Sequence, residues 1–167
     1  VTKVGTFGTL VVNATTGDYT YTPDAAAINF LAAGVSTSDV FTVTVTDGKV
    51  ASPITAEFRI DVTGANESPT LSSVATLTGG VEDTDYPISY ATLAAATDAA
   101  DRDNPVLSFR IEAISSGTLT KGGTAVVAGT TILGPSDSLV WRPALNANGM
   151  VKAFTITAWD GTVASAT

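Results

Sequence analysis

The side chains that could do chemistry in this 167-residue chain are acidic, and they lie in short, loop-like segments. Oxygen donors occur at Asn66-Glu67, at residues 101–104 (Asp-Arg-Asp-Asn) and at Asp160-Gly161. A calcium ion takes about six to eight oxygen ligands from carboxylates, amides and backbone carbonyls. The spacing Asp101-x-Asp103 lets two carboxylates of one irregular loop point at a single ion. The candidate metal ligands are therefore Asn66, Glu67, Asp101, Asp103, Asn104 and Asp160.

A plainer interpretation of each segment stays open. Asp160 could simply form a turn, and residues 101–104, followed by Pro105, could be a polar loop. A second acidic pair, Glu82 and Asp83, is also a candidate for metal binding, although it could be the solvated edge of a strand. Asp98 could join the cluster or only begin its loop.

The composition excludes several other kinds of site. The chain contains no His and no Cys, which excludes a Ser-His-Asp triad, a cysteine nucleophile, an ordinary zinc site and a disulfide framework. The net charge is −8, and the eight Lys and Arg residues are scattered, so we expect no nucleic-acid partner. No apolar run approaches the roughly 20 residues of a membrane span, so we expect no membrane insertion.

One pattern occurs twice along the chain. Residues 41–52 (FTVTVTDGKVAS) and 154–165 (FTITAWDGTVAS) are identical at eight of twelve positions. Two upstream blocks also match in the same order, Gly8-Thr9-Leu10 with Gly117-Thr118-Leu119, and YTYTP (19–23) with LVWRP (139–143). The offset between the blocks changes, which indicates loop insertions between shared strands. We therefore predict two copies of one domain about 110 residues apart, although two divergent, complete domains remain an alternative.

The predicted boundaries follow from this repeat. Residues 1–65 form the first copy, which is truncated at its N-terminus relative to the second copy. Residues 66–69 form a short linker, which Pro69 stiffens. Residues 70–167 form the second copy, which lacks the counterpart of the last strand of the first.

Strand signals dominate the elements that must position these residues. Residues 41–46 alternate strictly, with Phe41, Val43 and Val45 on one face and threonines on the other. Phe58, Ile60 and Val62 form the next strand. Further strands are predicted at residues 8–13, 18–22, 71–77, 107–114, 124–127, 138–141 and 154–158. Short helical turns are predicted at residues 24–33 and 90–96.

The fold class is therefore all-β, with tandem β-sandwich domains and one or two short helical turns. In a greek-key sandwich, the linker into the second copy meets the loop between its second and third strands and the turn after its penultimate main strand. This topology would gather the linker, residues 101–104 and Asp160 around one ion. Asp47 is the counterpart of Asp160 in the first copy.

Two tryptophans bear on an alternative function. Trp141 aligns with Tyr21, and we interpret both as core aromatics. Trp159 could pack against the linker or stand exposed as a platform for a ligand. The alternative function is therefore a glycan- or protein-binding module that uses Trp159 and residues 86–90.

The first copy resembles the VCBS-type repeat of large bacterial surface proteins, through GTFGTLVVN (5–13), GDYTYTPDAAAINFLAAG (17–34), DVFTVTVTDG (39–48) and VTGANESPT (62–70). The second resembles the related bacterial cadherin-like repeat, through VEDT (81–84), DAADRDN (98–104), LSFRI (107–111), SGTLTKGG (116–123), SLVWRPALNANG (138–149) and AFTITAWDG (153–161).

This resemblance implies tandem Ig-like, greek-key sandwiches in a secreted RTX-type adhesin at the bacterial cell surface, with calcium bound near the domain junctions. It also implies that Glu82 is a calcium ligand at the next domain junction downstream. The sequence departs from the family at the linker, where Asn66-Glu67-Ser68 replaces the usual Asn-Asp before proline.

We therefore expect calcium-binding extender repeats that stiffen a stalk for cell adhesion and have no enzymatic activity. The expected partners are neighbouring repeats of the same chain and a cell-surface glycan or protein. Ca²⁺ is the expected cofactor.

Overall fold

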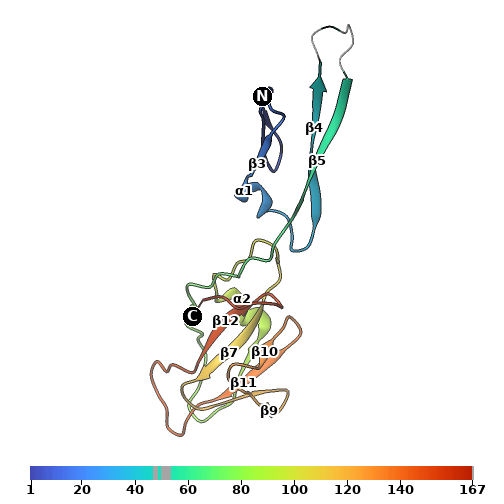
Figure 1. Ribbon diagram of the computed structural model, residues 1–167. Coiled ribbons are helices and arrows are strands. Elements are labelled where there is room, and N and C mark those ends of the chain that lie inside the picture. The colour runs from blue at the N-terminus through green and yellow to red at the C-terminus, as the bar shows by residue number, and fades with distance from the viewer. Residues whose placement is uncertain (47–48, 50–53, 167) are drawn as a thin grey trace. The chain divides into compact units, whose positions relative to one another are not determined.

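The computed structural model describes residues 1–46, 49 and 54–166 (Figure 1). Strands account for 42% of the chain and helices for 6%, so the prediction of an all-β protein is confirmed. The chain divides into two compact parts, Val1–Glu67 (unit 1) and Ser68–Thr167 (unit 2). No helix in the described part of the chain is long and apolar enough to cross a membrane.

Unit 1 contains two antiparallel sheets. The first has the order β1 (Thr2–Val4), β2 (Gly8–Val12), β3 (Tyr19–Pro23). The second pairs β4 (Ser36–Val45) with β5 (Ile54–Thr63) at ten consecutive positions. A four-residue helix, α1 (Ala25–Ile28), follows β3, and Asp24 caps it by accepting hydrogen bonds from the backbone N–H groups of Ala26 and Ala27. The helical turn predicted over residues 24–33 is thus present but shorter.

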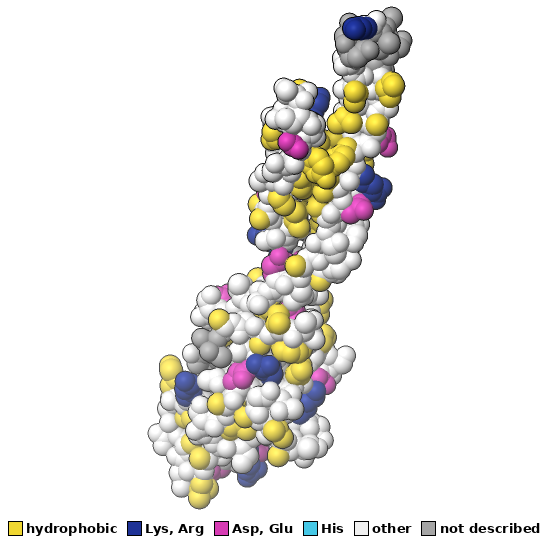
Figure 2. Space-filling view, in the orientation of Figure 1, with side chains coloured by type: hydrophobic (Ala, Val, Ile, Leu, Met, Phe, Trp, Pro, Cys, Tyr) yellow, Lys and Arg dark blue, Asp and Glu magenta, His cyan; other side chains and the backbone are white. Residues whose placement is uncertain are grey.

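The core of unit 1 is small and lies between its two sheets. Leu10, Phe41 and Val62 are its buried apolar side chains. The rings of Tyr19 and Phe58 meet edge to face with centroids 4.7 Å apart. Figure 2 shows apolar side chains gathered along the facing sides of the two sheets.

The prediction that residues 41–46 bury one whole face is only half right. Phe41 is buried and Val43 is half-buried, but Val45 is 68% exposed. Val45 lies at the last paired position of the two strands, opposite Ile54, which is 75% exposed, so burial is confined to the middle and the other end of the pair.

Unit 2 contains two sheets packed face to face. One has the order β10 (Ile132–Leu133), β7 (Ser108–Ile114), β12 (Phe154–Trp159). The other has the order β6 (Tyr86–Ser89), β11 (Ser138–Arg142), β8 (Thr118–Lys121), β9 (Thr124–Ala125). The short helix α2 (Tyr90–Ala95) follows β6. Both sheets and α2 contribute to one core of buried side chains, Ile88, Leu93, Phe109, Ile111, Leu119, Val126, Leu133 and Leu139.

The repeated sequence blocks have the same strand pairing in both units. Leu10 lies opposite Tyr21 in the β2–β3 pair, and Leu119 lies opposite Trp141 in the β8–β11 pair. These are the residues that the sequence repeat aligns. In unit 2, however, residues 122–137 stand between the two paired strands, where unit 1 has only the short turn at residues 13–18.

The same pairs also share a glycine beneath the aromatic ring. A Cβ atom on Gly8 would lie 2.4 Å from the Tyr21 ring, and one on Gly117 would lie 2.9 Å from Nε1 of Trp141. A side chain at Gly8 would therefore displace the Tyr21 ring, whereas one at Gly117 would first meet the backbone carbonyl of Arg142, 2.2 Å away, and Gly117 also has a φ of +70°. Close packing thus requires Gly at the start of both blocks.

The strand predicted at residues 71–77 is wrong. This segment forms only isolated bridges, Thr70 with Ala100 and Val74 with Thr97. The carboxylate of Asp98 accepts hydrogen bonds from the backbone N–H groups of Ser72 and Ser73, both at 2.9 Å. These N–H groups therefore bond to a side chain and not to a neighbouring strand.

Candidate functional site

The loop at residues 101–104 is organised by the first of its two aspartates. Oδ1 of Asp101 accepts hydrogen bonds from the backbone N–H groups of Asp103 and Asn104, both at 2.8 Å. This is the local turn that an aspartate side chain favours. The other carboxylate oxygen of Asp101, Oδ2, is buried and accepts no hydrogen bond from the described residues. A buried charged oxygen in this state is costly, and a cation would stabilise it.

Two other candidates lie at the same end of unit 2. Oδ1 of Asp103 is also shielded from solvent. Asp160 directly follows β12, and its Oδ1 accepts hydrogen bonds from the N–H groups of Thr162 at 2.6 Å and Val163 at 2.7 Å. Trp159, the last residue of β12, is opposite Ser108, the first residue of β7. The loop before β7 and the turn after β12 are therefore at the same end of their sheet.

The linker candidates belong to unit 1. Nδ2 of Asn66 donates a hydrogen bond to the backbone carbonyl of Glu67 at 3.0 Å, and both residues are half-buried. Oε2 of Glu67 is shielded from solvent. The predicted ligands are thus divided between two units, with Asn66 and Glu67 in unit 1 and the remaining six in unit 2.

Glu82 and Asp83 lie apart from the other candidates of unit 2. They precede β6, whose last residue leads into α2 and towards the loop at residues 101–104, so they are at the opposite end of the unit. Oδ1 of Asp83 accepts a hydrogen bond from the N–H of Asn146 at 2.9 Å, which ties two surface loops together. Asp47, the counterpart of Asp160, lies outside the described residues.

No group of three or more acidic side chains close enough to hold one metal ion is found within residues 1–46, 49 and 54–166. The described loops at one end of unit 2 carry carboxylate and amide oxygens, the donor type that a hard cation prefers, but at positions that are not gathered into one group.

A buried acidic residue that the sequence analysis missed is Asp39, on β4. Its carboxylate accepts hydrogen bonds from the N–H groups of Thr6 at 2.7 Å and Phe7 at 3.0 Å, and from the hydroxyl of Tyr21 at 2.8 Å. Burial, together with the nearby Asp39 carboxylate, raises the pKa of Tyr21 to about 12. The signal was available, because the alternation of β4 places Asp39 on the same face as Phe41. With its polar partners inside unit 1, Asp39 serves the packing of that unit.

Polar clusters also order unit 2. The hydroxyl of Thr157 donates to Glu112 at 2.6 Å, and Nε of Arg110 donates to the same carboxylate oxygen at 2.7 Å. These two hydrogen bonds, that of Thr157 above all, lower the pKa of Glu112. The Arg110 guanidinium also lies over the ring of Trp159, 5.2 Å from its centroid. Trp159 is therefore a half-buried part of this cluster.

The other aromatic residues of unit 2 serve its packing. Trp141 packs against the core as predicted, and its Nε1 donates to the carbonyl of Ser116 at 2.8 Å. The hydroxyl of Tyr86 donates to the carbonyl of Thr78 at 2.7 Å, and that of Tyr90 donates to the carbonyl of Leu107. Tyr86 thus ties the preceding loop to β6, and Tyr90 ties α2 to the segment just before β7.

Comparison of the chain with family models, with characterised proteins and with solved structures finds no match.

Proposed function

We propose that this chain forms calcium-binding structural repeats of a secreted bacterial surface protein, in which the ion stiffens a stalk that supports adhesion. In this proposal the two units are tandem Ig-like sandwiches. Their shared strand register, Leu10 with Tyr21 and Leu119 with Trp141, supports a common ancestry.

The observation that carries the proposal is the buried Oδ2 of Asp101, which accepts no hydrogen bond within the described part of the chain. Asp101, Asp103, Asn104 and Asp160 would hold the ion at the end of unit 2, with Asn66 and Glu67 as donors from the linker. The calcium ion would neutralise these carboxylates and so stabilise the folded chain by mass action, by about 2.7 kcal/mol at a hundredfold excess over the dissociation constant. Neighbouring repeats of the same chain would be its partners.

The test is a calcium titration of the full chain and of Asp101→Asn, followed by thermal unfolding and small-angle scattering. Asparagine keeps the oxygen that forms the local turn and removes the charge on the second oxygen. We expect calcium to raise the melting temperature of the unmodified chain and not that of Asp101→Asn. In the absence of calcium, Asp101→Asn should be the more stable protein, because a buried charge has been removed.

The matched control is Asp85→Asn, which removes an exposed carboxylate at the other end of unit 2, where Asp85 pairs with Arg142 at 3.0 Å. This variant should keep the full response to calcium. If neither stability nor the scattering profile of the unmodified chain responds to millimolar calcium, the proposed function is wrong.

A further inference from the structure

The dipeptide Asn148-Gly149 lies in the loop at residues 143–153, which joins β11 to β12. Both residues are exposed to solvent. An asparagine side chain is most open to attack by the backbone nitrogen of the next residue when that residue is glycine, because glycine has no side chain to obstruct the approach. The chain contains six asparagines, and Asn148 is the one that precedes a glycine.

The attacking group, the backbone nitrogen of Gly149, is accessible. Its N–H donates no hydrogen bond to any residue that the structure describes. Gly149 has a φ of +75°, and a Cβ atom built on it would meet nothing within 4 Å. Hydroxide from the solvent can therefore reach this N–H and remove its proton.

The attacked group, the side-chain amide of Asn148, is held by a single long hydrogen bond. Its Nδ2 donates to the backbone carbonyl of Asn146 at 3.2 Å, at the end of the usual range for such bonds. Asn146 is itself anchored, because its N–H donates to Oδ1 of Asp83 at 2.9 Å. The loop is thus fixed two residues before Asn148, and the exposed amide loses little free energy when it turns towards Gly149.

Two neighbouring asparagines of unit 2 are blocked at the attacking nitrogen. Asn104 precedes Pro105, which has no N–H to lose. Asn146 precedes Ala147, whose N–H donates to the carbonyl of Ala144 at 3.0 Å. Neither residue offers the free backbone nitrogen that Asn148 has beside it.

The three asparagines of unit 1 are held by their surroundings. Oδ1 of Asn13 accepts hydrogen bonds from two backbone N–H groups of its own turn, including that of Thr15 at 2.9 Å. Asn29 precedes Phe30, whose N–H donates to a carbonyl of the preceding helical turn at 3.3 Å. Asn66 is half-buried. The fold therefore leaves Asn148 as the most reactive of the six.

We propose that Asn148 is a site of spontaneous deamidation, which converts it to isoaspartate and aspartate while the chain is folded. The deprotonated nitrogen of Gly149 forms a bond to Cγ of Asn148. The bond between Cγ and Nδ2 then breaks, and ammonia leaves with the proton that Gly149 has lost, so that a cyclic imide remains.

Water completes the reaction by opening the imide at one of its two carbonyl carbons. Opening at Cγ restores the ordinary backbone and gives aspartate. Opening at the backbone carbonyl carbon of residue 148 leaves the chain running through the former side chain, as isoaspartate. One water is consumed and one ammonia is released, and no atom is oxidised or reduced.

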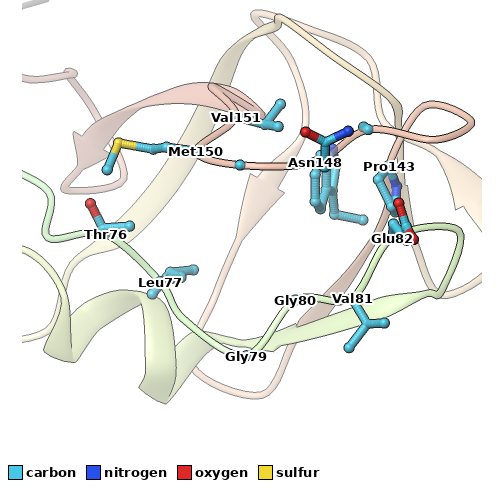
Figure 3. Close-up of a pocket in the computed structure, with 13 residues that line it drawn as sticks. Thr76, Leu77, Gly79, Gly80, Val81, Glu82, Pro143, Asn148, Met150 and Val151 are labelled. Atoms are coloured by element: carbon cyan, nitrogen blue, oxygen red, sulfur yellow. The ribbon is translucent and has the colours of Figure 1, made fainter.

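The modification adds a negative charge at a place that is already acidic. Asn148 and Glu82 both line a hollow of about 510 Å³ at the end of unit 2 opposite the proposed calcium ligands. Figure 3 shows Asn148 on the segment that lies across this hollow from Gly80 and Val81. Because each event replaces a neutral amide by a carboxylate, the modified chain should elute later from an anion-exchange column.

The test is incubation of the folded full chain in mildly alkaline buffer made with heavy-oxygen water, followed by peptide mapping with mass spectrometry. Trypsin cleaves after Lys121 and Lys152 and not between Arg142 and Pro143, so one peptide contains both Asn146 and Asn148, and its fragments distinguish them.

We expect residue 148 to take up one heavy oxygen atom at least tenfold faster than any of the other five asparagines is modified. An enzyme that methylates isoaspartyl residues should label the same peptide. Faster modification of any other asparagine would overturn the proposal.

A comparison with the unfolded chain tests what the structure adds to the sequence. In urea, the rate at Asn148 is that of the dipeptide without the fold. Because the loop leaves both reacting groups accessible, the rate in the folded chain should lie within tenfold of the rate in urea. A folded chain that reacts a hundredfold more slowly would show that the loop protects Asn148, and the proposal would be wrong.

Two glycines of similar conformation provide matched variants. Gly149 has a φ of +75° and Gly129 one of +73°, and a Cβ atom on either would meet nothing within 4 Å. Alanine therefore introduces the same backbone strain at both positions, but only Gly149→Ala puts a methyl group beside the attacking nitrogen. Gly149→Ala should slow the reaction at Asn148 at least tenfold, and Gly129→Ala should leave it unchanged. Equal effects of the two variants would contradict the proposal.

Discussion

The two units place equivalent aromatic residues in the same register but anchor them by different means. In unit 1, Tyr21 donates its hydroxyl to the buried carboxylate of Asp39, which also holds two backbone N–H groups. In unit 2, the position aligned with Asp39 is Lys152, which is exposed, and Trp141 donates to a backbone carbonyl. The equivalent aromatic residues are therefore held by a buried carboxylate in unit 1 and by a backbone carbonyl in unit 2.

The apolar cores explain this difference. Within the described residues, unit 1 buries three apolar side chains, and unit 2 buries ten. A unit with a small core depends more on each remaining buried interaction, so the Asp39 cluster supplies stability that packing supplies in unit 2. Destabilising substitutions should therefore act through lost packing in unit 2 and through lost hydrogen bonds to Asp39 in unit 1. The sizes of their effects on stability should differ as well.

The largest effect is expected from removing a core side chain of unit 2. Phe109→Ala leaves a cavity at the centre of the core and should lower the free energy of unfolding of unit 2 by about 3–5 kcal/mol. Denaturant unfolding followed by tryptophan fluorescence measures this, because both tryptophans are in unit 2. Hydrogen exchange in residues 8–12 of unit 1 should stay unchanged. A common shift in both units would show that they unfold together and would remove the basis of the comparison.

A smaller loss is expected from removing the buried charge of unit 1. Asp39→Ala leaves the N–H groups of Thr6 and Phe7 and the hydroxyl of Tyr21 without their acceptor, which should cost about 2–4 kcal/mol. Hydrogen exchange in residues 8–12 and 36–45 measures the loss. Lys152→Ala, at the aligned position of unit 2, should change stability by no more than about 0.5 kcal/mol. If both variants behave alike, the proposed difference in anchoring is wrong.

The smallest effects are expected from pH, because the titrating groups are partly accessible to solvent and screening weakens them. The pKa of Tyr21 is raised from 10.0 to about 12 in the folded chain, so unit 1 should keep its full stability below pH 10 and lose some as the pH rises towards 12. Lys121, and then the N–H of Gly134, lower the pKa of Asp137 below 3.8, so unit 2 should lose stability as the pH falls below that value.

Matched variants test these pH effects in each unit. Tyr21→Phe should remove the alkaline loss in unit 1, and Asp137→Asn should reduce the acid loss in unit 2. Tyrosinate absorbance and tryptophan fluorescence follow the two transitions. An alkaline loss that persists in Tyr21→Phe would show that another group is responsible.

Periodicity predicted most of the longer strands but missed β6, β8 and β10, which bury Ile88, Leu119 and Leu133 and are only two to four residues long. Residues 58–62 and 154–159 are strands because their apolar side chains recur at the spacing of a pleated surface. The same pattern was misleading at residues 71–77, because Asp98, distant in sequence, binds the N–H groups of Ser72 and Ser73. Such a contact depends on tertiary packing, which alternation does not describe.

Only the local hydrogen bonds of the candidate site could be predicted from the sequence. The turn at Asp101 follows from an aspartate with polar residues two and three positions later. The burial of its second oxygen depends on surrounding chain segments, and no local pattern indicates it. Asp39 could have been found from its inward position on β4, but its partners Thr6 and Phe7 are more than thirty residues away.

The sixteen residues between β8 and β11 show what this architecture tolerates. Their presence leaves the pairing of Leu119 with Trp141 in the same register as that of Leu10 with Tyr21, and Leu133 within them even joins the core. In unit 1 the corresponding connection is a short turn held by Asn13, whose Oδ1 accepts from the N–H of Thr15 at 2.9 Å. That turn is therefore a suitable position for grafting a foreign epitope or a reporter peptide.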